Sequence, residues 1–412
     1  MESDVFWVGI DWATEAHEVC VLRSDGSVLK QTSVKHDGAA LRALCDELVK
    51  LAGGDSSRVS VAIEVPRGAV VETLVERGFA VFSINPKQLD RFRDRHNVAG
   101  AKDDRRDAFV LGDSLRTDTS RYRRIRLDDP VVIKIREHSR IHDDLAEERN
   151  ALGNRLRDQL LRYFPQVLEL GDVYRNKWLW ALLERASTPA EAAKLREVTI
   201  RLLLKSHRIR SVDSVRVLET LRREPVTVAP GVVEAASAHV ALLLTRLRVV
   251  DEQDAAVSRR LRELLEALAT ADAGKAEHRD AAILHSLPGV GTIVCATMLA
   301  EAAQILAERD YKMLRALCGT APVTKQSGKS KSVTMRYACN SRLRHAAHHW
   351  ARSAVQNDPR SRAHYDALRQ RGKSQGHSYR AVADGLLKLL VGALRCGRLF
   401  DAERWRPVPA AA

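Results

Sequence analysis

Several features that mark other protein classes are missing from this sequence. The six cysteines are scattered without a CxxC pair, which argues against a zinc site and against a disulfide framework. Aromatic residues are only 5% of the chain, so stacking on single strands is not expected as its main way of binding nucleic acid. No apolar run reaches membrane-spanning length, and the first residues are acidic. These absences predict a soluble cytoplasmic protein with no membrane partner.

Acidic residues are also scarce in one long stretch. Residues 321–380 contain thirteen Lys and Arg but only Asp358 and Asp366, which leaves a net +11 in a chain of net +14. A solvated helix face is the simpler explanation of such a stretch. Like charges repel unless an anion neutralises them, however, so we favour nucleic acid as the partner.

Four carboxylates in the first 107 residues are the most informative feature that is present. Asp11 and Glu64 each end an apolar run of β type, and Asp104 and Asp107 lie one helical turn apart. Any one of them alone would be read as a cap or a surface charge. Together they predict a cage of hard oxygen ligands for Mg²⁺ or Mn²⁺, as phosphodiester chemistry requires.

The order of apolar patterns predicts the fold class and the domains. Three strands of antiparallel type, followed by alternating helices and strands, predict an α/β domain with a mixed sheet of ribonuclease-H or RuvC type over 1–128. Residues 129–275 read as long helices, either a coiled-coil arm or helices packed on their own chain, with a basic stretch around Lys205–Arg210. A mainly α-helical domain is expected over 276–404 and a disordered tail over 405–412.

A glycine-rich connection opens the third domain. Leu287-Pro288-Gly289-Val290-Gly291 precedes a helical run, which suits a helix-hairpin-helix turn whose backbone N–H groups meet a DNA phosphate. An ordinary helix connection is the alternative. With the basic stretch, the turn gives the following candidate nucleic-acid-binding residues: Gly289, Gly291, Lys325, Lys329, Lys331, Arg336, Arg342, Arg344, Arg371 and Lys373.

Several of these segments together resemble one transposase family. Pro322 to Gly328 is similar to the Pro-x-x-x-x-Ser-Gly segment of the insertion-sequence "one-ten" family of DEDD transposases, the bridge-RNA-guided recombinases. The segments around Asp11, Glu64 and Asp104 resemble its RuvC-like motifs in the same order, and Tyr365–Lys373 resembles its C-terminal part. The resemblance covers nearly the whole chain except the middle helices. Cys339-Asn340 stands where the family usually has Gly-Asn, which puts the geometry of that loop in doubt.

The resemblance implies an enzyme that moves its own insertion sequence. Asp11, Glu64, Asp104 and Asp107 would bind Mg²⁺, and Ser327 would attack DNA to form a phosphoserine link that conserves bond energy for rejoining. It implies donor and target DNA duplexes, a structured bridge RNA and a homodimer or homotetramer as partners, and nucleoid association in a prokaryote. The residues alone do not rank Ser327 above its neighbours Ser330 and Ser332.

Two other functions fit parts of the pattern. A metal-dependent endonuclease of Holliday-junction-resolvase type would use water as the nucleophile and make Ser327 incidental. A non-enzymatic nucleic-acid-binding protein would keep its acids for structure, but it leaves the ordered spacing of the four acids unexplained. We therefore expect the recombinase first and the endonuclease second.

Overall fold

The computed structural model describes residues 5–84, 89–90, 92, 103–126, 129–270, 276–328 and 330–402. The chain divides into two compact units, Met1–Asp128 and Asp129–Ala412. The further division of the second unit at residue 275 stays a prediction. The expected tail at 405–412 and Lys329 lie outside the described residues.

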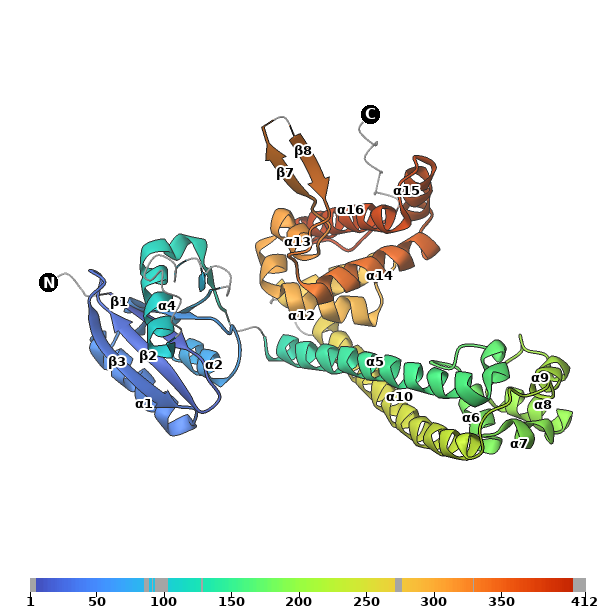
Figure 1. The fold of residues 1–412 in the computed structure, drawn as a ribbon. Helices are drawn as coiled ribbons and strands as arrows, with labels where there is room; N and C mark the ends of the chain where they lie inside the picture. Colours follow the sequence, from blue (N-terminus) through green and yellow to red (C-terminus); the bar gives the residue numbers. More distant parts are fainter. Residues whose placement is uncertain are drawn as a thin grey trace. The chain divides into compact units, whose positions relative to one another are not determined.

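The first unit is built on a six-stranded mixed sheet (Figure 1). The strand order is β3-β2-β1-β4-β5-β6; the first three strands are antiparallel, β1, β4 and β5 are parallel, and β6 is antiparallel to β5. This confirms the expected mixed α/β sheet. The strands are β1 Phe6–Asp11, β2 Ala16–Leu22, β3 Val28–Lys35, β4 Val59–Ile63, β5 Ala80–Ser83 and β6 Arg123–Arg124.

Helices cover this sheet because the strands are apolar on both faces. Alternate residues of β1, β2 and β4 supply one core with Leu41, Leu44 and Leu48, while Cys20, Leu22 and Ala108 form a smaller core on the other face. The helical elements of this unit are α1 Gly38–Leu51, η1 Ser56–Arg58, α2 Ala69–Glu76, α4 Asp104–Asp118 and η2 Thr119–Arg121.

Two long helices organise the second unit. Helix α5, Pro130–Tyr163, begins at the Asp129 cap, whose carboxylate accepts from the Val131 N–H at 2.8 Å, and it ends before Pro165. It packs along α10, Val232–Thr270, of the same chain (Figure 1). Between them lie η3 Pro165–Leu170, α6 Lys177–Arg185, α7 Pro189–Ala193, α8 Glu197–Ser206 and α9 Ser214–Leu221.

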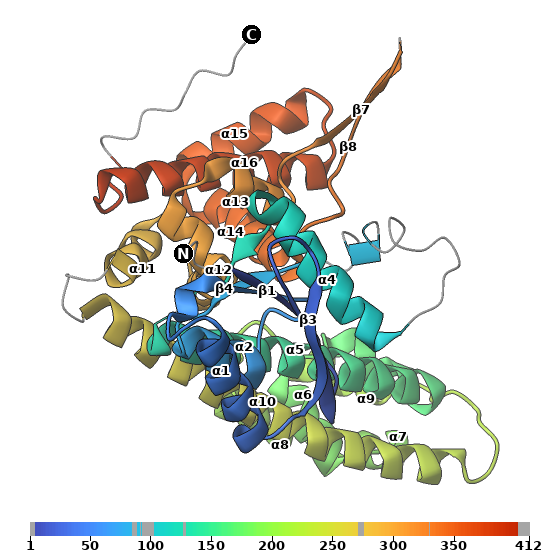
Figure 2. The same ribbon diagram turned by 90° about the vertical axis from the view of Figure 1, so that its left-hand side faces the viewer.

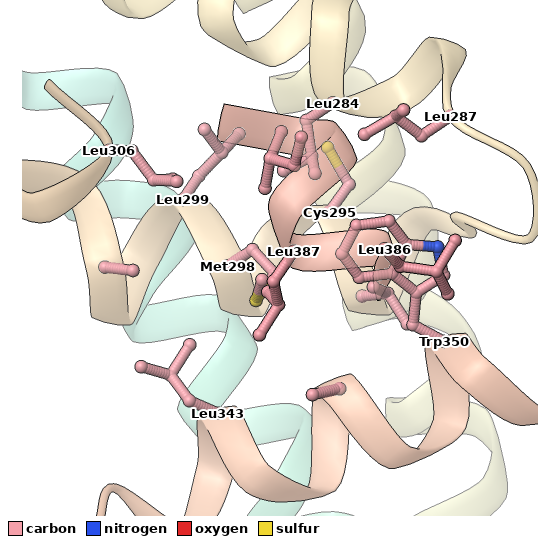
Figure 3. Packing of buried hydrophobic residues seen from close by; sticks show 14 of the residues in the cluster. Leu284, Leu287, Cys295, Met298, Leu299, Leu306, Leu343, Trp350, Leu386 and Leu387 are labelled. Carbon is pink, nitrogen blue, oxygen red and sulfur yellow. The ribbon is translucent and has the colours of Figure 1, made fainter. Parts of the chain in front are cut away.

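The remaining elements form a helical body with one hairpin. Trp350 is fully buried among the helices, and its Nε1 donates to the Pro288 carbonyl at 2.9 Å; Figure 3 shows Cys295, Met298 and Leu386 in the same core. The elements are α11 Ala276–Ser286, α12 Thr292–Glu308, α13 Tyr311–Leu317, β7 Val323–Ser327, β8 Ser330–Thr334, α14 Ser341–Asn357, α15 Pro359–Gln370 and α16 Gln375–Cys396.

The long helices contribute to two separate cores of the second unit. The first turns of α5 and the last turns of α10 pack with α11–α16, whereas the rest of both helices packs with η3 and α6–α9. Among the described residues, no helix is long and apolar enough to cross a membrane. All six cysteines are free thiols, four of them buried.

Candidate functional site

Three of the four predicted acids come together in the first unit. Asp11 is the last residue of β1, and Asp104 and Asp107 lie in the first turn of α4. One carboxylate oxygen from each lies within 4.8 Å of the other two. Asp104 is exposed, Asp11 is half-buried and Asp107 is only 2% exposed. Three negative charges this close repel strongly, and hard oxygen donors at this spacing fit one divalent cation.

Gly9 explains why α4 approaches β1 so closely. A Cβ on Gly9 would lie 1.8 Å from the Ala108 carbonyl oxygen and 2.5 Å from the Gly112 nitrogen. Both are backbone atoms of α4, so only glycine permits this packing. The helix begins here because the Asp103 side chain accepts from the Arg105 N–H at 3.2 Å. Asp103 is therefore the helix cap, and Asp104 and Asp107 point to the strand.

Glu64 lies at the same end of the sheet as Asp11, where the parallel strands β1 and β4 end, but it is outside this group of three. It follows β4, which is parallel to β1 with Ile63 opposite Ile10, so Glu64 and Asp11 leave neighbouring strands at equivalent positions. Its side chain is half-buried. Among the described residues, the group within 4.8 Å contains Asp11, Asp104 and Asp107 only. The role of Glu64 as a fourth ligand remains a prediction.

The sequence reasoning missed Glu18, a further acid beside the cluster. Glu18 lies directly opposite Asp11 in the antiparallel β1–β2 pair, so the two side chains point to the same face. Arg105 of α4 lies 3.6 Å from it, measured from Nε to the carboxylate Oε2, and that oxygen is buried without a hydrogen bond. Arg105 thus places a positive charge next to the acids. Only the register of β1 with β2 reveals this proximity.

Ser327 is the last residue of strand β7 in a two-stranded hairpin. The register pairs Ser327 with Ser330 and Lys325 with Ser332, so Gly328 and Lys329 make the connection in sequence. Gly328 has a φ of 54°, in the left-handed region that glycine adopts without strain. Ser327 is exposed, and both views show the hairpin extending away from the helical body (Figures 1 and 2).

The predicted basic residues fall into two groups. Lys325, Lys331, Arg371 and Lys373 are exposed. In contrast, Arg336 donates to the Ala321 carbonyl at 3.3 Å, and Arg344 donates to the carbonyls of Arg336 and Tyr337 at 3.1 and 2.8 Å. The second group therefore holds the segment between the hairpin and α14 in place.

Arg342 lies in an internal polar network of the second unit. Its guanidinium lies 3.2 Å from carboxylate oxygens of both Glu301 and Asp143, and it donates to Ser139 Oγ at 3.2 Å. Burial raises the pKa of the Asp143 carboxyl, but the hydrogen bond to His142 and the charge of Arg342 outweigh it, and the net result is a lowered pKa. Arg342 thereby joins α14 to α5 and α12.

The two glycines of the predicted helix-hairpin-helix turn, Gly289 and Gly291, differ in their surroundings. Gly289 has a φ of 77°, and a Cβ there would lie 2.5 Å from the Ala354 nitrogen of α14. Gly291 precedes α12 as its N-cap, is exposed, and has open space where a Cβ would be. Gly289 is thus needed for packing, while the N-terminus of α12 at Gly291 faces solvent.

A mixed α/β domain with acids clustered at the carboxyl end of β1 and the start of α4 is consistent with the DEDD class of nucleic-acid-processing domains. Comparison with known families agrees: a DEDD transposase model of the IS110 group matches residues 8–165 and a "Transposase IS116/IS110/IS902 family" model matches residues 281–366.

Individual relatives give the same result. The mini-circle protein of Streptomyces coelicolor named as the transposase for IS117 is 33% identical over 412 residues, 98% of this chain and 97% of the relative. The transposase-named protein y4uE of Sinorhizobium fredii is 50% identical over 209 residues, half of this chain, and the match spans 58% of y4uE. An insertion element IS110 protein of Streptomyces coelicolor is 27% identical over 406 residues. The chain belongs to the IS110/IS116/IS902 family of transposases, the "one-ten" family that its motifs resemble.

Proposed function

We propose that this transposase cleaves and rejoins DNA through a covalent link between Ser327 and a DNA phosphate. The observation that carries the proposal is the group of three carboxylates on β1 and α4, found in a chain of a transposase family. Asp11, Asp104 and Asp107, with Glu64 at the same end of the sheet, would hold Mg²⁺ or Mn²⁺. The bound cation would neutralise charge on the phosphate that reacts.

In the proposed reaction Ser327 supplies the nucleophile. Its Oγ forms a bond to phosphorus while the bond from phosphorus to a deoxyribose oxygen breaks; the serine gives up its proton and the departing oxygen takes one up. Reversal with a different DNA hydroxyl rejoins the strands and frees the serine. The exposed position of Ser327 at the end of β7 supports this role, because a DNA backbone can reach it there.

The proposed partners follow from charge and from the family. Lys325 and Lys331 lie on the two strands of the hairpin, and both are exposed beside Ser327. We assign donor and target DNA to these residues and to Arg371 and Lys373, with Gly291 at the start of α12 as a further phosphate contact. Guidance by a structured bridge RNA, a homodimer or homotetramer, and action on nucleoid DNA in the cytoplasm complete the proposal.

Covalent capture of DNA tests the nucleophile. Ser327→Ala is expected to abolish DNA–protein adducts while it leaves DNA binding unchanged, because the hydroxyl is exposed and supports no packing. Ser330→Ala and Ser332→Ala are matched controls on the facing strand and should form adducts at wild-type levels. Adducts are counted on denaturing gels with end-labelled DNA. The assignment would be refuted if Ser327→Ala still formed adducts, or if only one of the two control variants lost them.

The alternative is a metal-dependent endonuclease in which water attacks. One observation favours this alternative: the acidic group lies entirely within the first unit and could support cleavage by water without Ser327. It predicts cut ends without adducts and normal cleavage by Ser327→Ala.

The cation is tested by thermal unfolding. Mg²⁺ at about a hundred times its Kd should stabilise the first unit by about 2.7 kcal/mol, or roughly 10 °C in Tm. Asp107→Asn should remove this shift even if it raises stability in the absence of metal, since it relieves repulsion. Glu76→Gln removes one exposed charge at the end of α2 and should keep the shift. An equal shift in Asp107→Asn would count against the site.

A further inference from the structure

A basic cavity lies between helices α8 and α9 and includes the basic stretch around Lys205–Arg210. It has a volume of about 960 Å³ and is formed by one continuous stretch of chain. Its apolar floor comes from Leu204, which is buried, and from Ile209 and Val212, which pack on the core of η3 and α6–α10. Its polar lining consists of Arg201, Lys205, Arg208, Arg210, Ser211, Asp213 and Ser214.

The four cations of this cavity, Arg201, Lys205, Arg208 and Arg210, have no anionic partner among the residues that the structure describes. In the fully described stretch 129–270, none of them makes an ion pair or a side-chain hydrogen bond. Asp213 is the one acid of the lining, and its carboxylate accepts from the N–H groups of Val215 and Arg216 at 3.3 Å, as the cap of α9. A second carboxylate, Glu197, touches the lining, where its Oε1 accepts from Ser214 Oγ at 3.3 Å. The four cations still outnumber these two acids, so the cavity carries a net positive charge.

The backbone places these cations together at a cost. Arg201 and Lys205 are four residues apart on α8, a spacing at which like charges repel. Arg208 has a φ of 57°, a left-handed conformation in which a non-glycine residue is strained. It occupies the position after the C-cap of α8, where the Ile209 N–H bonds to the Leu204 carbonyl at 2.9 Å and where glycine is preferred.

The dipole of helix α8 does not explain the presence of all four cations in the cavity. A cation near the C-terminus of a helix is favoured by the helix dipole, which explains Lys205 in the last turn of α8. Arg201 lies a turn earlier, and Arg210 lies beyond the helix. An external anion explains all four at once, because it removes their mutual repulsion.

We propose that this cavity binds the phosphodiester backbone of a nucleic acid. Guanidinium groups pair with phosphate oxygens in a bidentate manner, and an apolar floor suits contact with sugars. The volume admits more than a single phosphate group. The cavity belongs to the α6–α9 core, whereas the hairpin with Ser327 connects α13 to α14, so the cavity would be an anchoring point additional to the catalytic residues. It concerns binding alone and does not depend on which group attacks DNA.

Arg208→Gly separates a structural role from a phosphate contact. Glycine suits the left-handed position, so the variant should melt at the wild-type temperature or above. If Arg208 contacts a phosphate, the same variant should bind about three- to tenfold more weakly, and the slope of log K against log salt should fall by about 0.9 on duplex DNA. The combined variant Arg201→Gln, Lys205→Gln and Arg210→Gln should weaken binding further.

Binding is measured with the full chain on two probes, a random-sequence duplex DNA and a folded hairpin RNA. Arg259→Gln removes one exposed charge from α10 outside the cavity and serves as the matched control. Weaker binding of the DNA, the RNA or both, with the control unchanged, supports the proposal and identifies the partner. Unchanged affinity and salt slope on both probes, or an equal loss in Arg259→Gln, overturns it. Because no adduct is measured, failure here leaves the Ser327 proposal untouched.

Discussion

At the scale of single residues, the acidic group depends on a position that carries no side chain. Gly9 lies two residues before Asp11, and the α4 backbone at Ala108 and Gly112 occupies the space in which its Cβ would lie. Asp107 is one residue before Ala108. The missing side chain at Gly9 thus sets the distance between the strand that carries Asp11 and the helix that carries Asp104 and Asp107.

Gly9→Ala is therefore expected to displace α4 and open the acidic group. Overpacking of backbone against backbone should cost about 3 kcal/mol or more of stability, and Mg²⁺-dependent stabilisation should disappear with it. Gly38→Ala is the matched control, because a Cβ there meets no atom within 4 Å. Thermal melts with and without Mg²⁺ report both quantities. A Gly9→Ala protein with wild-type stability and an intact Mg²⁺ shift would contradict this explanation.

The sequence revealed some site residues and not others for a physical reason. Asp11, Asp104 and Asp107 were predictable because a strand end and a single helical turn are local patterns. Glu18 was not, because its proximity to Asp11 depends on a cross-strand register that the sequence does not state. The structural contacts of Arg342 were equally invisible, since its partners Glu301 and Asp143 lie on distant helices.

At the scale of elements, buried strands and long helices were predictable and the exposed hairpin was not. Strands β1, β4 and β5 consist of apolar runs that must be buried, so their positions follow from composition. Nine of the ten residues of β7 and β8 are exposed. Their sequences do not alternate apolar and polar residues, which is the pattern that predicts a half-buried strand. The remaining signal was the Gly328-Lys329 pair, the right length for a two-residue hairpin connection.

A histidine pair, His17 of β2 and His36 directly after β3, should make the first unit sensitive to acid. His17 is 1% exposed; the Ala13 N–H donates to its Nδ1 at 3.3 Å, and its Nε2 lies 2.9 Å from His36 Nδ1. Burial, and secondarily the charge of His36, lowers the pKa of His17. A proton on Nδ1 would break the bond to Ala13, which belongs to the connection after Asp11.

The sign of the pH effect follows from this lowered pKa. The unfolded chain takes up a proton on His17 near pH 6.5, whereas the folded chain resists it until lower pH. The contribution of His17 to the free energy of unfolding is thus fully present above about pH 6.5. It is lost, at a rate of at most about 1.4 kcal/mol per pH unit, as the pH drops through the folded pKa. This loss of stability is measured by hydrogen exchange of the backbone amides of β1 and β2, corrected for the intrinsic exchange rates. His17→Gln should flatten the slope, while His239→Gln, an exposed histidine of α10, should not; equal slopes in all three proteins would disprove the assignment.

At the scale of the whole molecule, the proposed chemistry is divided between two units of the chain. The acidic group belongs to Met1–Asp128, and Ser327 belongs to Asp129–Ala412. A family expectation of dimers or tetramers makes it possible for the serine of one subunit to act with the acids of another. A sequence cannot decide this, because the same residues serve a site within one chain or between two.

Mixing two inactive variants distinguishes these arrangements. In a mixed dimer of Ser327→Ala and Asp11→Asn chains, a site shared between subunits leaves one intact combination, the serine of the second chain with the acids of the first. Random assembly should then restore roughly a quarter of wild-type strand cleavage, while rejoining that needs both sites stays blocked. Sites within one chain restore none. The control mixes Asp11→Asn with Asp107→Asn; both lesions lie in the same unit, so neither arrangement can rebuild an intact site. Cleavage restored by the first mixture and not by the second establishes sharing, and inactivity of both mixtures places the serine and the acids of each site on one chain.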